Sequence, residues 1–318
     1  AAHRRRVRDG AAPTSERMRL FGTPWPSRLQ AILGRFGCGP ERLAGGADVL
    51  HWTDYTPLPR TRVPVVATIH DVLFDELPTC YTPGMRRGLR LATTRIVRVA
   101  KRLIVPSTHT QRALVAEYGA SPRRIDVVPH GVRPLPDVAP ASGYGPYVLF
   151  VGTLEPRKNL GRLLEAFARL DARSRVRLVV AGPRGWKDDA CVERMRTQPG
   201  VVWEGGVGRD RLSALYRGAL AVAYPSLGEG FGLPVVEAMS VGRPLLVGRD
   251  TSCADIAGEA GLAVEPRDVE ALAGALARLV DDAPLRETLG ERGRARARAY
   301  TWARAARETL ASYARAVA

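Results

Sequence analysis

The 318-residue sequence has little cysteine and little lysine, and it has no long apolar run. Its four cysteines, Cys38, Cys80, Cys191 and Cys253, form neither a C-x-x-C pair nor a metal-like cluster, so we interpret them as reduced thiols. No apolar run approaches the roughly 20 residues that span a bilayer, and the basic start lacks the apolar segment of a secretory signal. We therefore expect a cytoplasmic protein without a metal site that is neither integral to a membrane nor exported.

The net charge of +16 comes almost entirely from arginine, because lysine occurs only at positions 101, 158 and 187. Arginine-rich text near the start and at 86–102 can attract anionic lipid headgroups, which predicts peripheral association with the inner face of a membrane. A solvated helix face is the alternative explanation of the same stretch. Nucleic acid is not an expected partner, because no recognition motif is present and stacking aromatics do not interleave with the basic residues.

Strand and helix patterns alternate along most of the chain, which predicts an α/β fold. In the first half, short strands are expected at 47–52, 63–69, 102–106 and 125–128, with a basic helix at 83–101. The stretch 134–146 is crowded with proline and glycine and is typical of a linker between domains.

The second half alternates more regularly, which predicts a doubly wound parallel sheet. Strands are expected at 147–152, 176–181, 201–204, 219–224, 244–247 and 261–265, and helices at 159–170, 209–217, 269–281, 284–298 and 302–316.

The segment Glu229-Gly-Phe-Gly-Leu-Pro-Val-Val-Glu237 sets two carboxylates eight positions apart around a turn that opens a helix. Gly230 and Gly232 permit close backbone approach to a ligand, and the first amides of the helix, from Gly230 through Phe231 and Gly232 to Leu233, favour a phosphate. A carboxylate accepts hydrogen bonds only, so each acid suits vicinal hydroxyls of a sugar or a ribose. The alternative is a pair of solvated surface acids near a helix start.

A second motif, Gly152-Thr-Leu-Glu-Pro-Arg157-Lys158-Asn159, follows a strand and opens a helix. It places two cations beyond the carboxyl edge of the sheet, where they can neutralise a diphosphate leaving group. A loop without a ligand explains this octet equally well on its own. A third element, Thr68-Ile-His70-Asp71, projects His70 from a strand end toward the cleft, although a lone histidine also suits a structural role.

The first of these segments resembles the E-x7-E signature of retaining glycosyltransferases of family four, which have the GT-B architecture of two Rossmann-like domains. The resemblance includes Tyr224-Pro-Ser226, the Gly-Phe-Gly turn, Glu237-Ala-Met and Gly242-Arg-Pro244. The GTLEPRKN string resembles the diphosphate-binding turn of the same family, although Thr153 stands where many members have arginine. The Thr-x-His-Asp element resembles one that places its histidine beside the donor sugar.

The resemblance implies roles for individual residues. Glu237 would bind the ribose and Glu229 the donor sugar, while Arg157 and Lys158 would bind the donor diphosphate. His70 would orient the sugar or the transition state. Two further candidates are Val207, in the loop that frames the base in similar proteins, and Ser107, at a strand end, although both also suit packing or capping.

The resemblance also implies a domain organisation. An acceptor-side domain would occupy residues 1–142, a nucleotide-sugar domain residues 143–300, and a final helix at 301–318 would pack back on the first domain. The similarity is expected over about 63–318, because residues 1–50 show little strand signal. The first domain is therefore expected to be incomplete, with its opening elements lost or replaced.

The implied reaction moves a hexose-type sugar from a nucleotide diphosphate, with GDP-mannose and UDP-glucose as common donors, to a saccharide or lipid-linked acceptor with retention. Surface polysaccharide assembly is a common setting. No cofactor or metal is expected beyond the donor. Three alternatives stay open: a sugar-nucleotide epimerase of the same architecture, an inactive nucleotide-binding scaffold, and a nucleic-acid binder.

Overall fold

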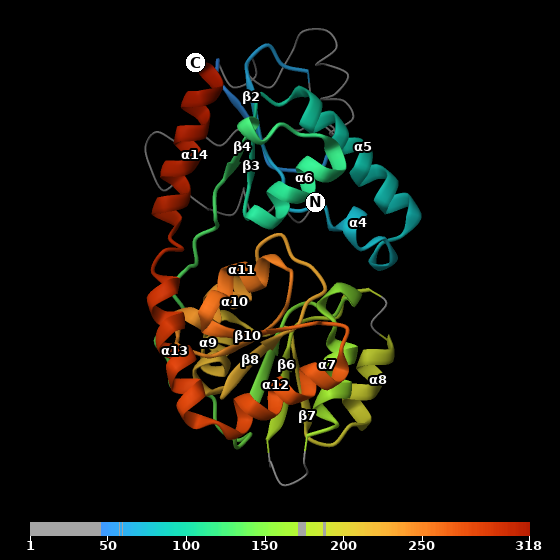
Figure 1. Cartoon of the computed structure of the whole chain (residues 1–318), viewed down its shortest axis with the longest axis vertical. Helices are drawn as coiled ribbons and strands as arrows, with labels where there is room; N and C mark the ends of the chain where they lie inside the picture. Colours follow the sequence, from blue (N-terminus) through green and yellow to red (C-terminus); the bar gives the residue numbers. More distant parts are fainter. Residues whose placement is uncertain (1–45, 57, 59, 171–175, 187–188) are drawn as a thin grey trace.

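A computed structural model describes residues 46–56, 58, 60–170, 176–186 and 189–318. It contains two parallel sheets, one above the other in Figure 1, each flanked by helices. The expectation of missing or replaced opening elements concerns residues 1–50, of which 1–45 lie outside the described residues.

The upper sheet has four parallel strands in the order β1-β2-β3-β4. Its strands are β1 (Leu50–Trp52), β2 (Val65–Thr68), β3 (Arg102–Val105) and β4 (Ile125–Val127), and its helices are α4 (Leu73–Glu76), α5 (Pro83–Val99) and α6 (Thr108–Tyr118). Short 3-10 turns lie at Pro78–Cys80 and Pro122–Arg124. Each strand lies within its predicted range, and the basic helix at 83–101 is confirmed as α5.

The lower sheet has six parallel strands in the order β10-β9-β8-β5-β6-β7, which confirms the predicted doubly wound sheet. The strands are β5 (Tyr147–Val151), β6 (Arg177–Ala181), β7 (Val201–Gly205), β8 (Ala221–Tyr224), β9 (Leu245–Gly248) and β10 (Gly261–Val264). The helices are α7 (Leu160–Phe167), α8 (Asp189–Thr197), α9 (Arg209–Gly218), α10 (Leu233–Ser240), α11 (Ser252–Ala257), α12 (Val269–Asp281) and α13 (Ala283–Ala297), with 3-10 turns at Pro156–Lys158 and Gly258–Ala260.

Strand β5 shows why this sheet forms. Its residues Tyr147, Val148, Leu149 and Phe150 are all buried, as expected for a parallel strand that is covered on both faces. Leu149 packs into one hydrophobic core, whereas Val148 and Phe150 pack into the core on the opposite face. The continuous apolar run therefore supplies both layers.

The last helix, α14 (Trp302–Val317), lies beside the upper sheet and contacts β2 and β3 (Figure 1). Its buried positions are small residues, which allow close approach to the strands. Asp126, the middle residue of β4, fixes this helix, because its carboxylate accepts a hydrogen bond from Ser312 (2.7 Å) and pairs with Arg315 (2.9 Å) and with Arg102. Burial opposes ionisation of Asp126, but these three partners lower its pKa below its usual range.

The predicted alternation implied helices between the strands, but no residue range was predicted for α4, α6, α8 and α11. The local sequence does carry the signal for α6, because Ser107 accepts a hydrogen bond from the Thr110 amide at its start and Gly119, in the left-handed region (φ 60°), ends it. The capping alternative for Ser107 is therefore confirmed. None of the helices in the described part of the chain is both long enough and apolar enough to cross a bilayer.

Candidate functional site

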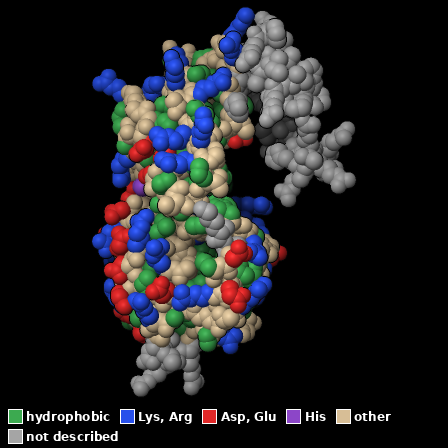
Figure 2. Space-filling model, turned by 90° about the vertical axis from the view of Figure 1, so that its right-hand side faces the viewer, with side chains coloured by type: hydrophobic (Ala, Val, Ile, Leu, Met, Phe, Trp, Pro, Cys, Tyr) green, Lys and Arg blue, Asp and Glu red, His purple; other side chains and the backbone are tan. Residues whose placement is uncertain are grey.

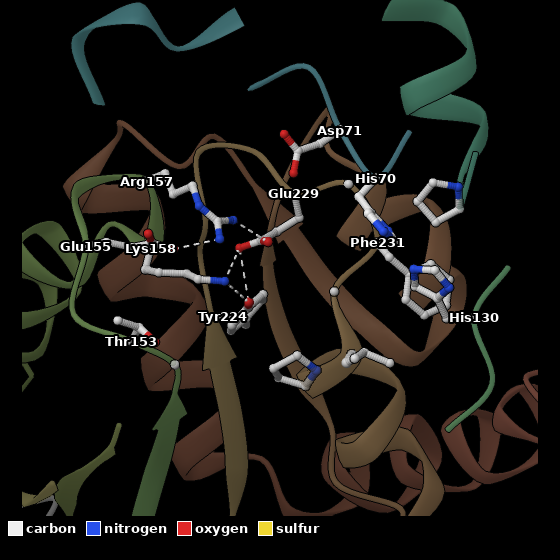
Figure 3. Close-up of a pocket in the computed structure, with 16 residues that line it drawn as sticks. His70, Asp71, His130, Thr153, Glu155, Arg157, Lys158, Tyr224, Glu229 and Phe231 are labelled. Atoms are coloured by element: carbon white, nitrogen blue, oxygen red, sulfur yellow. Dashed lines mark hydrogen bonds and ion pairs between the residues drawn. The ribbon is translucent and has the colours of Figure 1, made fainter. Parts of the chain in front are cut away.

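A pocket of about 350 Å³ lies between the two sheets. The upper unit contributes His70, Asp71, Pro106 and His130, which follow strands β2, β3 and β4. The lower unit contributes the Gly152–Lys158 turn, Tyr224 and the loop that leads into α10. Because the carboxyl ends of parallel strands form one edge of a sheet, each sheet presents its loops to the other across this pocket (Figure 3).

Most of the predicted site residues meet in this pocket. They are His70, Arg157, Lys158, Glu229, Gly230, Phe231, Gly232 and Leu233. Thr153, the departure from the family pattern, also lines it.

The turn after β5 presents Arg157 and Lys158 to the pocket. Its geometry depends on Asn159, which is in the left-handed region (φ 62°) and makes no side-chain cap to α7. The Asn159 side-chain amide donates instead to the carbonyl oxygens of Pro225 (3.0 Å) and Pro266 (2.6 Å). These bonds hold the cationic turn against the loops that follow β8 and β10.

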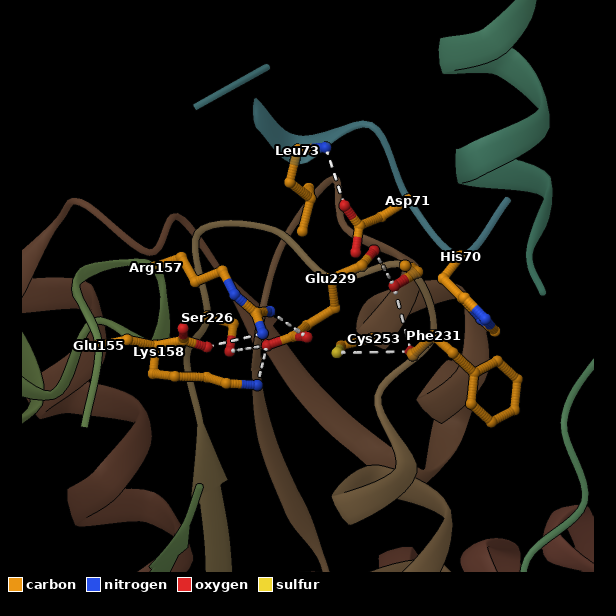
Figure 4. Close-up of polar contacts among 12 residues, drawn as sticks. His70, Asp71, Leu73, Glu155, Arg157, Lys158, Ser226, Glu229, Phe231 and Cys253 are labelled. Atoms are coloured by element: carbon orange, nitrogen blue, oxygen red, sulfur yellow. Dashed lines mark hydrogen bonds and ion pairs between the residues drawn. The ribbon is translucent and has the colours of Figure 1, made fainter. Parts of the chain in front are cut away.

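Glu229 is the centre of a buried ion-pair network. Its Oε1 accepts hydrogen bonds from Lys158 Nζ (2.6 Å), Tyr224 (3.0 Å) and Ser226 (2.9 Å), and its Oε2 pairs with Arg157 (2.5 Å). A carboxylate has about four acceptor positions on its two oxygens, so the protein itself uses most of them. The carboxylate that was predicted to bind sugar hydroxyls thus also holds both cations in place (Figure 4).

The charges of this network are strongly coupled. Burial would raise the pKa of Glu229, but Lys158 and Arg157 outweigh that effect and lower the pKa below its usual range. Glu155, which pairs with Arg157 at 2.6 Å, shows the opposite balance, because burial raises its pKa and the two cations only partly offset it. The pKa values of these two neighbouring carboxyl groups are therefore shifted in opposite directions.

The start of α10 lies directly behind this network. Gly232 precedes the helix in the left-handed region (φ 105°), and Pro234 occupies the second position of the helix, where proline is well tolerated. Gly230 was predicted to allow close approach of the backbone to a ligand. The structure gives another reason for glycine here, because a Cβ would overlap the backbone carbonyl of His70. Glycine at this position lets the two units touch.

Glu237 and Val207 do not line the pocket. Glu237 lies four residues into α10, half-buried, and accepts a hydrogen bond from Tyr216 (3.0 Å). Burial raises its pKa, while Tyr216 and Arg209 act against that rise. Val207 packs beside the same lower core as Tyr216. Glu237 thus lies outside the pocket lining but only one helical turn from the pocket residues Leu233 and Pro234, and Tyr216 contacts both Glu237 and Pro234.

Among the pocket residues that were not predicted as part of the site are His130 and Asp71 of the upper unit. The His130 ring lies 5.7 Å from that of His70 and 5.1 Å from that of Phe231, and it stacks on Trp302 at 6.1 Å. Burial, assisted by His70, lowers the pKa of His130 to about 4, so it is neutral near pH 7. Both residues follow a strand end as His70 does, and applying the same rule to every strand would have found them.

Comparison with known proteins places the chain in a family. Residues 137–296 match the model described as Glycosyl transferases group 1, and residues 2–134 match the one described as Glycosyltransferase Family 4. The chain belongs to the group 1 glycosyltransferases. The match begins at residue 2, so the prediction that similarity starts near residue 63 was wrong.

Relatives of this glycosyltransferase act on several substrates. The chain is 30% identical to the O-antigen chain mannosyltransferase B of Escherichia coli over 272 residues, which cover 80% of this chain and 71% of that protein. It is 28% identical over 319 residues to the MMP alpha-(1->4)-mannosyltransferase of Mycolicibacterium hassiacum, covering 93% and 77%. It is also 32% identical to the D-inositol 3-phosphate glycosyltransferase of Nocardia farcinica, covering 81% of this chain and 62% of that one.

Solved structures support the fold. Sucrose-phosphate synthase from Thermosynechococcus elongatus aligns with a TM-score of 0.72 at 23% identity, over 93% of this chain and 82% of that one. Anabaena HepE in complex with UDP and glucose aligns with a TM-score of 0.71 at 20% identity, over 91% and 84%. The glycosyltransferase thus has the GT-B fold, as predicted.

Proposed function

We propose that this glycosyltransferase moves a hexose-type sugar from a nucleotide diphosphate, of the GDP-mannose or UDP-glucose kind, to a saccharide or lipid-linked acceptor with retention of configuration. One observation carries the proposal: Arg157 and Lys158 converge on the pocket in front of the α10 N-terminus. Two fixed cations and the first amides of a helix are suited to a diphosphate. The proposal keeps Glu229 and His70 beside the sugar and Glu237 and Val207 beside the nucleoside.

A front-side displacement accounts for retention. The acceptor oxygen would form its bond to the anomeric carbon on the face from which the phosphate oxygen leaves, and the acceptor proton would pass to that phosphate oxygen. Glu229 is poorly suited to attack the anomeric carbon, because Lys158, Arg157, Tyr224 and Ser226 already bind its carboxylate. A sugar trapped covalently on Glu229 or Asp71 would contradict this mechanism.

No divalent metal is needed in this proposal. Arg157 and Lys158 supply positive charge where it grows on the leaving diphosphate, and within the described residues no group of three or more His, Cys, Asp or Glu forms a metal-like cluster. We expect chelation with EDTA to leave turnover unchanged, whereas a loss that added Mg²⁺ restores would contradict this part of the proposal.

We further propose that α5 associates with an anionic membrane. Met85 and Leu91 are 50% and 65% exposed on this helix, which carries five arginines and no acid. Figure 2 views the side of the molecule on which α5 lies in Figure 1, and it shows many basic side chains on the upper part and a more even mixture of charges below. Apolar side chains among cations fit a lipid interface.

A thermal-shift screen with GDP-mannose and UDP-glucose tests the donor proposal. A ligand that binds the folded state raises the melting temperature by mass action, so at least one donor should stabilise the wild-type protein. Glu237→Ala should abolish the shift if Glu237 binds the ribose. Glu287→Ala, an exposed acid on α13, is the matched control and should keep the shift. If neither donor stabilises the wild type, or if the two variants respond alike, the proposal fails.

A further inference from the structure

Asp71 belongs to the upper unit and lies across the pocket from the Glu229 loop of the lower unit (Figure 4). Its backbone is fixed on both sides by Tyr55, whose hydroxyl donates to the Asp71 carbonyl (2.5 Å) and accepts from the Asp71 amide (3.0 Å). Its Oδ1 accepts the amide hydrogen of Leu73 (3.2 Å). The position of the carboxyl group is therefore set before any substrate arrives.

The second oxygen of Asp71 is unoccupied. Within the described part of the chain, no hydrogen bond or ion pair reaches Oδ2, although the carboxyl group lines the pocket. Arg157 lies in the same pocket, but it is already bound by Glu229 and Glu155. Burial raises the pKa of Asp71, which the Leu73 amide and Arg157 only partly offset. A carboxyl of this kind is a good acceptor for a hydrogen bond from a substrate hydroxyl.

Two aromatic side chains lie near this part of the pocket, Tyr81 from the upper unit and Trp186 from the lower one. Burial and the nearby Asp71 and Glu155 carboxylates raise the pKa of the Tyr81 hydroxyl above its usual range, with Arg157 acting against them. Trp186, 38% exposed, reaches from the loop after β6 and donates its indole N–H to the carbonyl of Cys80 (3.1 Å), next to Tyr81. Aromatic rings combine an apolar face with a polar tip, which suits the C–H face and hydroxyls of a pyranose.

We propose that Asp71 binds the hydroxyl of a saccharide acceptor, whose ring lies between Tyr81 and Trp186. This inference rests on the proposed function and deepens it by assigning the acceptor side. Asp71 accepts a hydrogen bond from a hydroxyl next to the attacking one and so positions the acceptor ring; the attacking oxygen then bonds to the anomeric carbon, the bond to the phosphate oxygen breaks, and the proton of the attacking hydroxyl passes to that phosphate oxygen. An acceptor that met Asp71 with a phosphate would be repelled, so the contacting group is a neutral hydroxyl.

Steady-state kinetics on simple glycosides tests this assignment. The probes are octyl α-D-mannopyranoside and octyl β-D-glucopyranoside, with octanol as an alcohol that lacks a sugar, and the donor is the one that stabilises the wild type. Asp71→Asn keeps an oxygen for the Leu73 amide and should fold normally. We expect its kcat/KM for the glycosides to fall about 10- to 100-fold, the usual effect of losing one hydrogen bond to a charged group. The donor-induced thermal shift should stay unchanged.

A matched control separates this effect from a general loss of charge. Asp54→Asn alters an exposed carboxylate of the β1–β2 loop and should leave every parameter at the wild-type value.

The pH dependence of kcat/KM separates direct contact from a structural role. The fall of kcat/KM for the glycosides at acid pH in the wild type should disappear in Asp71→Asn, which a merely structural role would not produce. Trp186→Leu should raise KM for the glycosides without changing donor binding.

These measurements separate failure of the Asp71 assignment from failure of the proposed function. If no donor stabilises the wild type, the proposed function fails and this inference fails with it. If the donor binds but Asp71→Asn transfers as fast as the wild type, only the assignment of Asp71 is overturned. If the wild type transfers to neither glycoside, or to octanol equally well, the saccharide acceptor is overturned.

Discussion

The two walls of the pocket differ in how their charged groups are held. On the lower wall, Lys158 and Glu229 are buried and paired with each other, and Arg157 joins Glu229 to Glu155. On the upper wall, His70 is exposed and the Asp71 carboxyl has a single backbone partner. Buried charges that are paired keep a fixed geometry, whereas polar groups without a full set of partners can still bind a ligand.

This difference indicates a division of labour. Under the proposed function, the donor diphosphate would need cations at fixed positions, and the lower wall holds Arg157 and Lys158 in place before any ligand binds. The names of three relatives refer to an O-antigen chain, to MMP and to D-inositol 3-phosphate. Under the proposed function, the open hydrogen-bonding groups of the upper wall would bind the hydroxyls of the acceptor. The comparison predicts that substitutions on the lower wall reduce stability and turnover together, whereas those on the upper wall reduce turnover alone.

Lys158→Met should give the largest effect. It keeps the apolar stem but removes the ammonium group that binds Glu229 and Tyr224, leaving a buried carboxylate with less compensation. Breaking a buried ion pair costs about 3–5 kcal/mol of unfolding free energy. Loss of one charge-stabilising donor should also lower kcat by about 100-fold or more. Urea unfolding and donor turnover measure the two effects.

The control is an ion pair on the surface. Arg169 pairs with Glu165 at 3.3 Å and with Glu270, and its side chain is 40% exposed. Arg169→Met should cost less than about 1 kcal/mol and leave turnover unchanged. Equal losses of stability in the two variants would show that the network around Glu229 is not the rigid part of the pocket.

Gly230→Ala is expected to have an intermediate effect, because it acts where the two walls touch. The added methyl group would overlap the His70 carbonyl, and Thr110, which donates to the Gly230 carbonyl (3.3 Å), would have to move as well. Overpacking of this kind costs about 1–3 kcal/mol. We expect a lower melting temperature, and a fall in transfer that exceeds any loss of donor binding, since the upper wall moves away.

Gly274→Ala on α12 is the control for this substitution. A Cβ at Gly274 meets no atom within 4 Å, and the residue is exposed in a helix, so alanine should raise stability by about 0.5–1 kcal/mol. If both variants are stabilised, contact between Gly230 and His70 does not constrain the pocket.

The lower wall shows what the sequence can and cannot predict. The strands were predictable because continuous apolar runs mark them, and the two motifs were predictable because each lies within about ten consecutive residues. The pairing of Glu229 with Arg157 was not, because the two are 72 positions apart and only the fold brings them together. For the same reason the sequence indicated sugar hydroxyls as the partners of Glu229, but not the two cations.

The upper wall was harder to predict for another reason. Asp71 ends the Thr68-Ile-His70-Asp71 element but was given no role, and His130 belongs to no motif described above; that both reach the pocket depends on which strand ends meet at one edge of a sheet. The contact of Gly230 with His70 could not be predicted from the sequence either, because His70 belongs to the other unit. The fold class and the motif residues follow from local sequence, whereas contacts across the cleft require the three-dimensional arrangement.

The smallest expected effect concerns pH and two histidines of the upper unit, His130 and His109. In the folded state the pKa of His130 is about 4, below its ordinary value of about 6.5, because burial and His70 disfavour the cation. Its contribution to stability is thus fully present above pH 6.5 and is lost as the pH falls toward 4, by an amount on the order of 1 kcal/mol for a half-buried ring.

The pKa of His109 is shifted in the opposite direction, because its hydrogen bond to Glu76 raises it. Its contribution is present below pH 6.5 and is lost as the pH rises through the folded-state value. Melting temperatures of the wild type, His130→Asn and His109→Asn between pH 4 and pH 8 measure both, and the two difference curves should slope in opposite directions. A His130→Asn variant that tracks the wild type over the whole range would mean that the ring on the upper wall is already open to water, and the contrast between the walls would then rest on His70 and Asp71 alone.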